Sequence, residues 1–175
     1  MTPIPDKLLT FYAGTGWDDR GRTFDDVLRF THVELEDVHD YIQWVFPLFQ
    51  RSGANPAAPV LDDRTAEAFR RDQSLRRQMR RIFDVMLGFY GLEMVVANGA
   101  IRVNQNASFQ ERRAVWLTRN NHNFLRLTRI LKCLSILHAS DLSRALLACL
   151  LEIDAQYPAV ISTHTIRYWR DAVPL

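Results

Sequence analysis

The chain of 175 residues has little of what most metal and redox sites need. Its two cysteines, Cys133 and Cys149, form no Cys-x-x-Cys pair, and its five histidines show no His-x-x-x-His spacing. Glu36 and His39 form one Glu-x-x-His pair, but helical carboxylate sites use two such pairs and further glutamates. We therefore predict no metal and no cofactor. We interpret both cysteines as small, buried apolar residues of helices.

Long apolar runs and a leader peptide are also missing. No apolar run reaches the roughly 18 residues that a membrane span needs. The first residues, Met-Thr-Pro-Ile-Pro-Asp-Lys, have neither the basic start nor the apolar core of a signal peptide. We expect a cytoplasmic protein without a membrane span. The chain also lacks G-x-S-x-G, a phosphate-binding glycine loop and a nucleotide fingerprint, so we predict no catalytic residues.

Lysine is scarce, since Lys7 and Lys132 are the only two and all other basic residues are arginine. Arginine suits bidentate binding of carboxylate or phosphate, although a codon bias in the source organism explains the same preference. One basic stripe combines Arg126, Arg129 and Lys132. A larger cluster consists of Arg70, Arg71, Arg76, Arg77, Arg80 and Arg81.

Such basic stripes can contact phosphate backbones. However, acidic residues lie close to the larger cluster in sequence and can pair with it. These acids are Asp62, Asp63, Glu67, Asp72 and Asp84. Nucleic acid is therefore the less favoured partner.

Apolar residues recur every three or four positions over most of the chain, which is typical of helices with one buried face. The clearest stripes run from Leu75 to Tyr90 and from Phe124 to Leu137. We predict an all-α fold, an irregular multi-helix bundle that forms a single domain over residues 1–175. A short β-hairpin near residues 93–103 is the one departure that the pattern allows, because Asn98-Gly99 suits a tight hairpin turn.

Several expected helices begin at a residue whose side chain accepts hydrogen bonds from first-turn N–H groups. The expected capping residues are Thr23, Thr31, Asp62 or Asp63, Asp72 or Ser74, and Ser140. Thr31 and Glu34 have the spacing of a capping box. Gly91 marks the end of the long helix before the hairpin.

The most unusual stretch is residues 39–48, His-Asp-Tyr-Ile-Gln-Trp-Val-Phe-Pro-Leu. A run so rich in large aromatic and aliphatic residues has to be buried. Its polar members then need partners, because a buried unpaired polar group costs roughly 1–3 kcal/mol. Pro47 ends any preceding helix. We expect a helix with an extended exit, wedged between other helices.

Three stretches resemble, in the same order, the conserved region of the opioid growth factor receptor family. They are residues 39–48, Met-Leu-Gly-Phe-Tyr-Gly-Leu at 86–92, and His-Asn-Phe-Leu-Arg-Leu-Thr-Arg-Ile-Leu-Lys-Cys-Leu at 122–134. The resemblance implies a helical region and carries over no catalytic residues. The vertebrate member binds the pentapeptide Met-enkephalin and works at the nucleus. The chain resembles a microbial member, without the vertebrate repeat-bearing tail or lysine-rich nuclear signal.

Polar and aromatic residues of the first and third stretches form the predicted ligand site. They are His39, Asp40, Gln43, Trp44, Asn121, His122, Arg126 and Arg129. Aromatic walls with a few convergent polar groups are typical of ligand pockets, and an arginine can hold a carboxylate. The alternative is that these groups satisfy one another inside the fold.

We therefore predict a non-enzymatic binding module for a peptide, a small ligand or a protein partner. One alternative is an enzyme that uses His39, Asp40, His122 and Arg126 in one cleft. The other is nucleic-acid binding through arginine.

Overall fold

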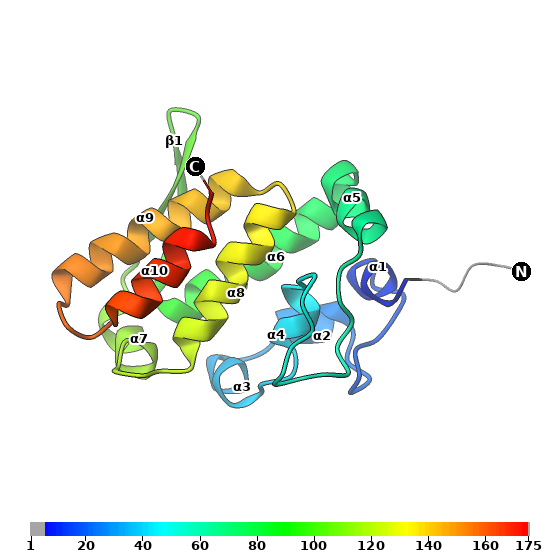
Figure 1. Cartoon of the computed structure of the whole chain (residues 1–175), viewed down its shortest axis with the longest axis horizontal. Helices are drawn as coiled ribbons and strands as arrows, with labels where there is room; N and C mark the ends of the chain where they lie inside the picture. Colours follow the sequence, from blue (N-terminus) through cyan, green and yellow to red (C-terminus); the bar gives the residue numbers. More distant parts are fainter. Residues whose placement is uncertain (1–5, 175) are drawn as a thin grey trace, which may run out of the picture. The chain divides into compact units, whose positions relative to one another are not determined.

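The computed structural model describes residues 6–174, in which ten helices and one β-hairpin form (Figure 1). This confirms the all-α prediction and the hairpin. The helices are α1 Lys7–Tyr12, α2 Phe24–Leu28, α3 His32–Asp37, α4 Ile42–Val45, α5 Asp63–Arg71, α6 Gln73–Tyr90, α7 Phe109–Trp116, α8 Asn123–Ile136, α9 Ser140–Gln156 and α10 Thr163–Asp171. The strands are β1 Leu92–Ala97 and β2 Ala100–Gln105. Residues 1–5 lie outside the described range. They belong to the N-terminal segment in which we predict no signal peptide.

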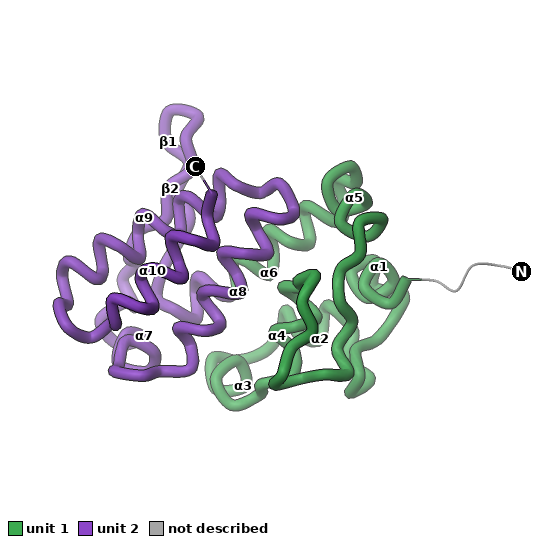
Figure 2. Tube along the Cα trace, viewed as in Figure 1, with its two compact units in different colours: residues 1–85 green, residues 86–175 purple. Residues whose placement is uncertain are grey.

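The chain divides into two compact units, unit 1 with residues 1–85 and unit 2 with residues 86–175 (Figure 2). The division falls within α6, which carries the long apolar stripe expected from the sequence. The residues of that stripe are all buried: Leu75, Met79, Ile82, Phe83, Met86 and Tyr90. The single domain over residues 1–175 stays a prediction.

Short helices of unit 1 begin at capping side chains, as expected. Thr23 and Thr31 each form a complete capping box, with Asp26 and Glu34 respectively. Asp62 accepts a hydrogen bond from the backbone of Thr65 at the start of α5. Asp72, just before α6, accepts one from the backbone of Ser74. The predicted caps of these four helices are therefore confirmed.

The core of unit 1 is a group of aromatic rings in edge contact. Its members are Phe11, Tyr12, Phe24, Trp44 and Phe69, all at most 1% exposed. The Tyr12 hydroxyl donates to the carbonyl oxygen of Val45. Residues 41–48 of the central stretch are buried, and α4 ends in a bend at Phe46, before Pro47. The expected helix forms as a single turn, but its exit is not extended at Phe46, whose φ and ψ are −133° and 73°.

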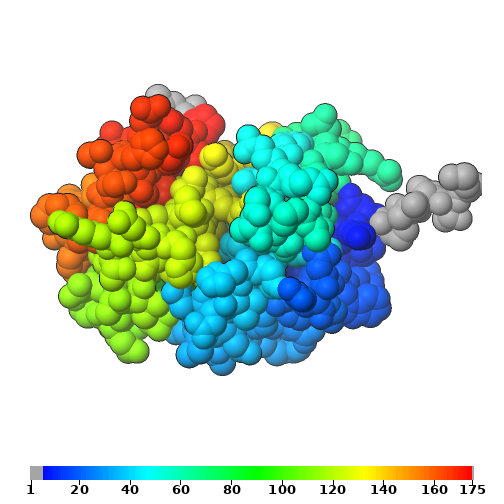
Figure 3. Space-filling model, turned by 60° about the horizontal axis from the view of Figure 1, so that its bottom comes forward, coloured from blue at the N-terminus to red at the C-terminus, as the bar shows by residue number. Residues whose placement is uncertain are grey.

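Residues 51–59 of unit 1 form a loop without a helix or strand. Figure 3 shows this loop, in cyan, beside the blue segments of the same unit. The Asn55 side chain donates to the carbonyl of Asp40 at 3.1 Å. The loop is thereby attached to the start of the central stretch.

Unit 2 combines α8, α9 and α10 with the hairpin, whose strand β2 packs along α9 (Figure 1). β1 and β2 pair antiparallel from Leu92 opposite Gln105 to Ala97 opposite Ala100. Asn98 and Gly99 have φ of 52° and 75°, as a two-residue type I′ turn requires. The hairpin is one or two residues longer than predicted, because Asn104 and Gln105 pair although they are polar.

The predicted cap of α9 is wrong. Ser140 is the first residue of α9, and Ala139 occupies the capping position without a side-chain hydrogen bond. His138 has a left-handed φ of 59°, and the Ala139 N–H donates to the carbonyl of Leu134. This turn places the helix start one residue earlier than the serine pattern indicates.

Two further findings concern the described residues 6–174. None of the helices there is long and apolar enough to cross a membrane. Both cysteines are buried free thiols, as predicted. Burial raises the pKa of Cys149 to about 12 and also raises the pKa of Cys133. Such thiols stay protonated, which suits a packing role and not a nucleophilic one.

Candidate functional site

Asp40, one of the predicted ligand residues, lies in an ion-pair network of unit 1. Its carboxylate accepts hydrogen bonds from Arg20 at 2.8 Å and from Arg22 at 2.6 Å. Arg22 also pairs at 2.6 Å with Asp18, whose side chain is fully buried. The other Asp18 oxygen accepts the backbone N–H groups of Arg20 and Arg22. The network therefore ties the loop at residues 18–22 to the start of the central stretch.

The charges of this network shift the pKa values of its members. Burial alone would raise the pKa of Asp40, but hydrogen bonds and charge from Arg22 and Arg20 bring it below its ordinary value. Burial alone would lower the pKa of Arg22, and its bonds to Asp40 and Asp18 raise it instead. Both groups are therefore held in their charged forms. A carboxylate held in this way is a weak partner for a neighbouring histidine in acid–base chemistry.

The other predicted residues of the central stretch differ in exposure. Trp44 is 1% exposed, and its indole N–H donates to Asp19 at 3.2 Å. Gln43 is 5% exposed; its amide nitrogen lies 3.4 Å from the Ser52 hydroxyl, and its carbonyl oxygen is buried without a hydrogen-bond partner among the described residues. His39 lies just before them on the surface. Trp44 thus serves as part of the core, and Gln43 keeps an unused acceptor.

In unit 2, the predicted residues form a chain of hydrogen bonds at the start of α8. The side-chain oxygen Oδ1 of Asn121 accepts hydrogen bonds from the backbone N–H and the side-chain amide of Asn123, at 2.9 and 3.0 Å. Asn123 is fully buried and in turn accepts from Arg126 at 3.3 Å. Asn121 also donates to the carbonyl of Val115 at 3.0 Å. These bonds join α8 to the end of α7, so Asn121 and Arg126 help to build the fold.

The last two predicted residues belong to α8, His122 at its start and Arg129 in its middle. His122 is exposed and occupies the capping position of α8 without a side-chain cap bond. Arg129 is half-buried, and burial lowers its pKa below the ordinary value. Within unit 1, Asp40, Gln43 and Trp44 lie on one turn; within unit 2, Asn121, His122, Arg126 and Arg129 lie along one helix. A shared ligand role for the eight residues stays a prediction.

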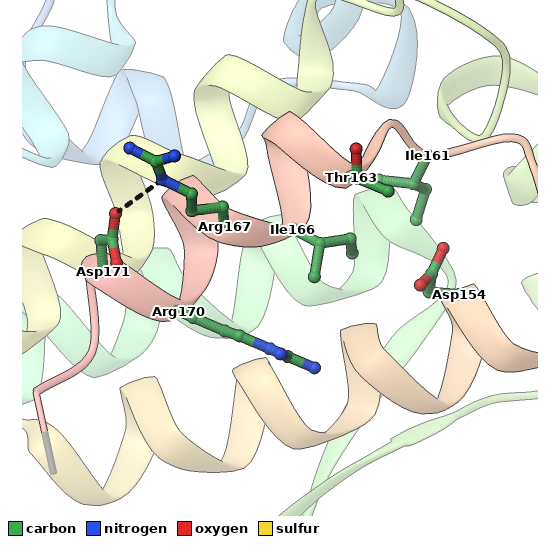
Figure 4. A pocket seen from close by; sticks show the side chains of 7 residues that line it. All are labelled: Asp154, Ile161, Thr163, Ile166, Arg167, Arg170 and Asp171. Carbon is green, nitrogen blue, oxygen red and sulfur yellow. Dashed lines mark ion pairs between the residues drawn. The ribbon is translucent and has the colours of Figure 1, made fainter.

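A pocket that the sequence did not indicate lies between α9 and α10 (Figure 4). Its volume is about 440 Å³. The lining residues are Asp154, Ile161, Thr163, Ile166, Arg167, Arg170 and Asp171. The Arg170 side chain extends along the pocket toward its Asp154 end, as Figure 4 shows. Sequence reasoning missed this pocket because its charged residues come from a short helix without a recognisable motif.

Charges in this pocket are loosely engaged. Arg167 and Asp171 approach to only 3.9 Å, with side chains 78% and 65% exposed. Arg170 makes no hydrogen bond or ion pair through its guanidinium within residues 6–174. Ile161 is buried and Ile166 half-buried, so they give the pocket an apolar wall. An open guanidinium beside aliphatic side chains suits a ligand that has an anionic group and an apolar group.

A second, smaller pocket of about 330 Å³ lies on the other side of the α10 end, against α8. Its lining consists of Lys132, Ser135, Ile136, Asp171, Ala172 and Pro174. Asp171 thus borders both pockets. Across the described range 6–174, no group of three or more His, Cys, Asp or Glu residues could hold a metal ion.

Comparison with known proteins identifies the family. The family model described as "Opioid growth factor receptor (OGFr) conserved region" matches residues 17–173. The chain belongs to this family. It is 40% identical over 131 residues to the opioid growth factor receptor of Mus musculus and 38% identical over 119 residues to that of Homo sapiens. These alignments cover 72% and 67% of the chain.

A second group of relatives carries a different name within the same family. The opioid growth factor receptor-like protein 1 of Xenopus tropicalis is 37% identical over 103 residues, which is 59% of the chain. The chain spans about a fifth of the length of these opioid growth factor receptor relatives, between 17% and 20%. No solved structure matches the chain.

Proposed function

We propose that this chain is a non-enzymatic binding module whose pocket between α9 and α10 takes the carboxylate end of a short peptide or small ligand. The observation that carries this proposal is the Arg170 guanidinium, which lies in the pocket without a bonded partner in the part of the chain that the structure describes. Guanidinium forks match carboxylates in a bidentate geometry. The receptor relatives support a binding role, since their name describes recognition of a growth factor.

The remaining lining residues narrow the ligand further. Ile161 and Ile166 offer contact to an aliphatic side chain next to the carboxylate. Asp154, at the far end, accepts hydrogen bonds from a ligand N–H or ammonium group. A volume of about 440 Å³ suits one or two terminal residues of a peptide. A protein partner that presents a free C-terminal residue would meet the same groups.

Titration calorimetry with two forms of one peptide tests this proposal. Met-enkephalin with a free carboxylate is expected to bind, and its C-terminal amide to bind about tenfold more weakly, because a hydrogen bond to a charged group contributes roughly 1.5–3 kcal/mol. Arg170→Ala should remove the difference between the two peptides. Arg144→Ala is the matched control, because Arg144 is exposed on α9 and does not line the pocket. Equal affinity of wild type and Arg170→Ala for the free peptide would contradict the proposal.

A second, separate part of the proposal is that the eight residues of the predicted ligand site, within residues 39–44 and 121–129, contact a ligand. Gln43→Leu tests them without disturbing a strong bond, since among residues 6–174 the Gln43 side-chain carbonyl has no hydrogen-bond partner and its amide nitrogen lies a long 3.4 Å from Ser52. Its effect on stability is expected to stay within about 1 kcal/mol. A loss of peptide affinity in this variant, with unchanged stability, would support a ligand role for the stretch. Unchanged affinity would assign Gln43 to the fold alone.

We also propose that the protein works in the cytoplasm. Fractionation of cells that produce the chain tests this location. The protein is expected in the soluble cytoplasmic fraction. Recovery in the membrane pellet would contradict it.

A further inference from the structure

The strongest concentration of charge in the chain lies at the end of α5 and in the first half of α6. Residues 70–81 contain six arginines and a single acid, Asp72, whereas the whole chain has a net charge of +2. Four of these arginines form what we name the arginine face: Arg76, Arg77, Arg80 and Arg81. All four are exposed. Because a helix rises 1.5 Å per residue, their backbone positions fall within about 7.5 Å of helix length.

Glu67 lies within α5 and Asp72 just after it, while Asp84 and Asp25 lie near Arg80 and Arg81 of the arginine face. Glu67 pairs with Arg70 at 3.4 Å and with Arg71 at 2.6 Å, so its carboxylate is used within α5. Asp72 accepts the backbone and hydroxyl hydrogen bonds of Ser74 at 2.6 and 2.7 Å. Glu67 thus pairs with two arginines of the larger cluster, as the sequence indicated, whereas Asp72 binds Ser74 and forms no ion pair within residues 6–174.

Members of the arginine face differ in how firmly they are engaged. Arg76 donates to the carbonyl of Arg70 and so holds the junction of α5 and α6. Arg81 donates to the Gln78 side chain at 2.7 Å and lies 3.4 Å from Asp25, but the Arg81 and Asp25 side chains are more than half exposed. Such exposed ion pairs contribute little in water. Arg77 makes no hydrogen bond or ion pair within residues 6–174 and is attracted to Asp72 only at longer range. Arg77 and Arg81 lie one turn apart, and both side chains are exposed.

We propose that the arginine face binds the phosphate backbone of a nucleic acid. Guanidinium groups bind phosphate bidentately. Four of them in fewer than two turns require a ligand whose negative charges repeat at short intervals. Nucleic acids meet this requirement, because each strand of a duplex carries one phosphate per 3.4 Å of rise. An acidic protein segment meets it only with a run of consecutive acids. The face therefore recognises the backbone and not the base sequence.

Fluorescence anisotropy on the full chain tests this proposal, with a labelled 20-nucleotide single strand and its duplex between 50 and 200 mM NaCl. Four phosphate contacts should weaken wild-type binding about 100-fold over this range. The double variant Arg77→Gln/Arg81→Gln leaves Arg76 and the helix junction intact. Its binding should weaken only about tenfold over the same range, because two contacts remain. If the double variant fails to fold by circular dichroism, Arg77→Gln alone should lower the salt slope by about 0.8.

The matched control is Arg102→Gln/Arg144→Gln, which removes the same charge from two exposed positions of β2 and α9. This control should keep the wild-type salt dependence. The proposal is overturned if wild type shows no salt-sensitive binding, or if both double variants lose binding equally. It is also overturned if polyglutamate of equal charge displaces the labelled strand as well as unlabelled nucleic acid does.

Discussion

Five helices that begin in unit 1 start at a side chain that accepts a backbone hydrogen bond, whereas among the described helices that begin in unit 2 only α10 does so. The caps of unit 1 are Asp6, Thr23, Thr31, Asp62 and Asp72. The corresponding positions of α7, α8 and α9 make no side-chain cap bond. Most of the described helices that begin in unit 1 therefore have locally defined starts, whereas most of those that begin in unit 2 have starts that depend on packing.

The units also use polar side chains differently. In unit 1, Asp18, Arg22 and Asp40 form a partly buried ion network that joins segments about twenty residues apart. In unit 2, Trp116 and Trp169 donate to the backbone carbonyls of Tyr90 and Phe124 at 3.0 and 3.2 Å. Charged residues of α10 remain at the surface, around the pockets. Each unit thus combines charges that serve the fold with charges at the surface: the network around Asp40 and the exposed arginine face in unit 1, and buried Arg126 and the exposed charges of α10 in unit 2.

The largest effect is expected from Trp44→Ala in unit 1. Trp44 is 1% exposed, contacts Phe11 at a ring distance of 5.2 Å and donates to Asp19. Truncation should lower the free energy of unfolding by about 3–5 kcal/mol, measured by urea denaturation. Trp17→Ala is the control, because Trp17 is 63% exposed and its loss should cost less than about 0.5 kcal/mol. A Trp44→Ala variant with wild-type stability and lost ligand binding would reverse the core assignment.

Gly91→Ala should have the next largest effect, in unit 2. Gly91 has φ of +74°, and a Cβ there would lie 2.6 Å from the Cα of Phe109. The left-handed backbone and the clash together should cost at least about 2 kcal/mol, measured by thermal unfolding. Gly88→Ala is the matched control in α6, since a Cβ there meets nothing within 4 Å. It should raise stability by about 0.5–1 kcal/mol. Equal effects of the two variants would show that the close approach is unimportant.

Asp40→Asn should weaken unit 1 in a pH-dependent way. Because the folded state lowers the pKa of Asp40, its stabilisation is fully present above the ordinary pKa of about 4. It is lost as pH falls through the lowered value. We expect Asp40→Asn to cost about 1–2 kcal/mol at pH 7, and this cost to shrink in urea titrations below pH 4. Asp171→Asn, in the exposed 3.9 Å pair of unit 2, should cost less than about 0.5 kcal/mol. An Asp40→Asn cost that does not change between pH 7 and pH 3 would contradict the role of this pair.

The smallest changes in the free energy of unfolding are expected from substitutions at the starts of α3 and α9. Thr31→Ala removes the hydroxyl that accepts the Glu34 N–H in a capping box, while the backbone N–H of residue 31 can still donate to Glu34. This loss should cost about 1 kcal/mol. Ser140→Ala should change stability by only a few tenths of a kcal/mol, because the Ser140 side chain caps nothing. Guanidinium chloride denaturation of both variants measures the difference. A larger loss in Ser140→Ala than in Thr31→Ala would show that α9 depends on its first serine.

Much of the secondary structure could be predicted because its signals are local. Thr31 and Glu34 are three residues apart, so their reciprocal hydrogen bonds require no other part of the chain. Asn98-Gly99 adopts left-handed backbone angles at low cost and therefore defines the hairpin turn. Ser140 shows where local patterns fail, since the turn at His138 and not the serine sets the start of α9.

The candidate site could be predicted much less well, because a polar residue has the same sequence signal whether it binds a ligand or another part of the fold. Asp40 meets Arg22 across 18 residues, and Trp44 meets Asp19 across 25. The spacing of residues along the sequence does not reveal such distant pairs. The pocket between α9 and α10 could not be predicted for the same reason, since Asp154 and Arg170 come close only when the two helices pack.

The sequence by itself determined the helices with their local caps, the hairpin turn, the buried central stretch and the family to which the chain belongs. These features depend on neighbouring residues, on apolar periodicity or on a long, unusual motif. Only the tertiary structure decided which charged side chains are engaged in the fold and which remain available. Ion pairs and hydrogen bonds form between atoms a few ångströms apart, and packing alone brings those atoms together. For this reason Asp40 is held by two arginines, while Arg170 and Arg77 form no ion pair within residues 6–174.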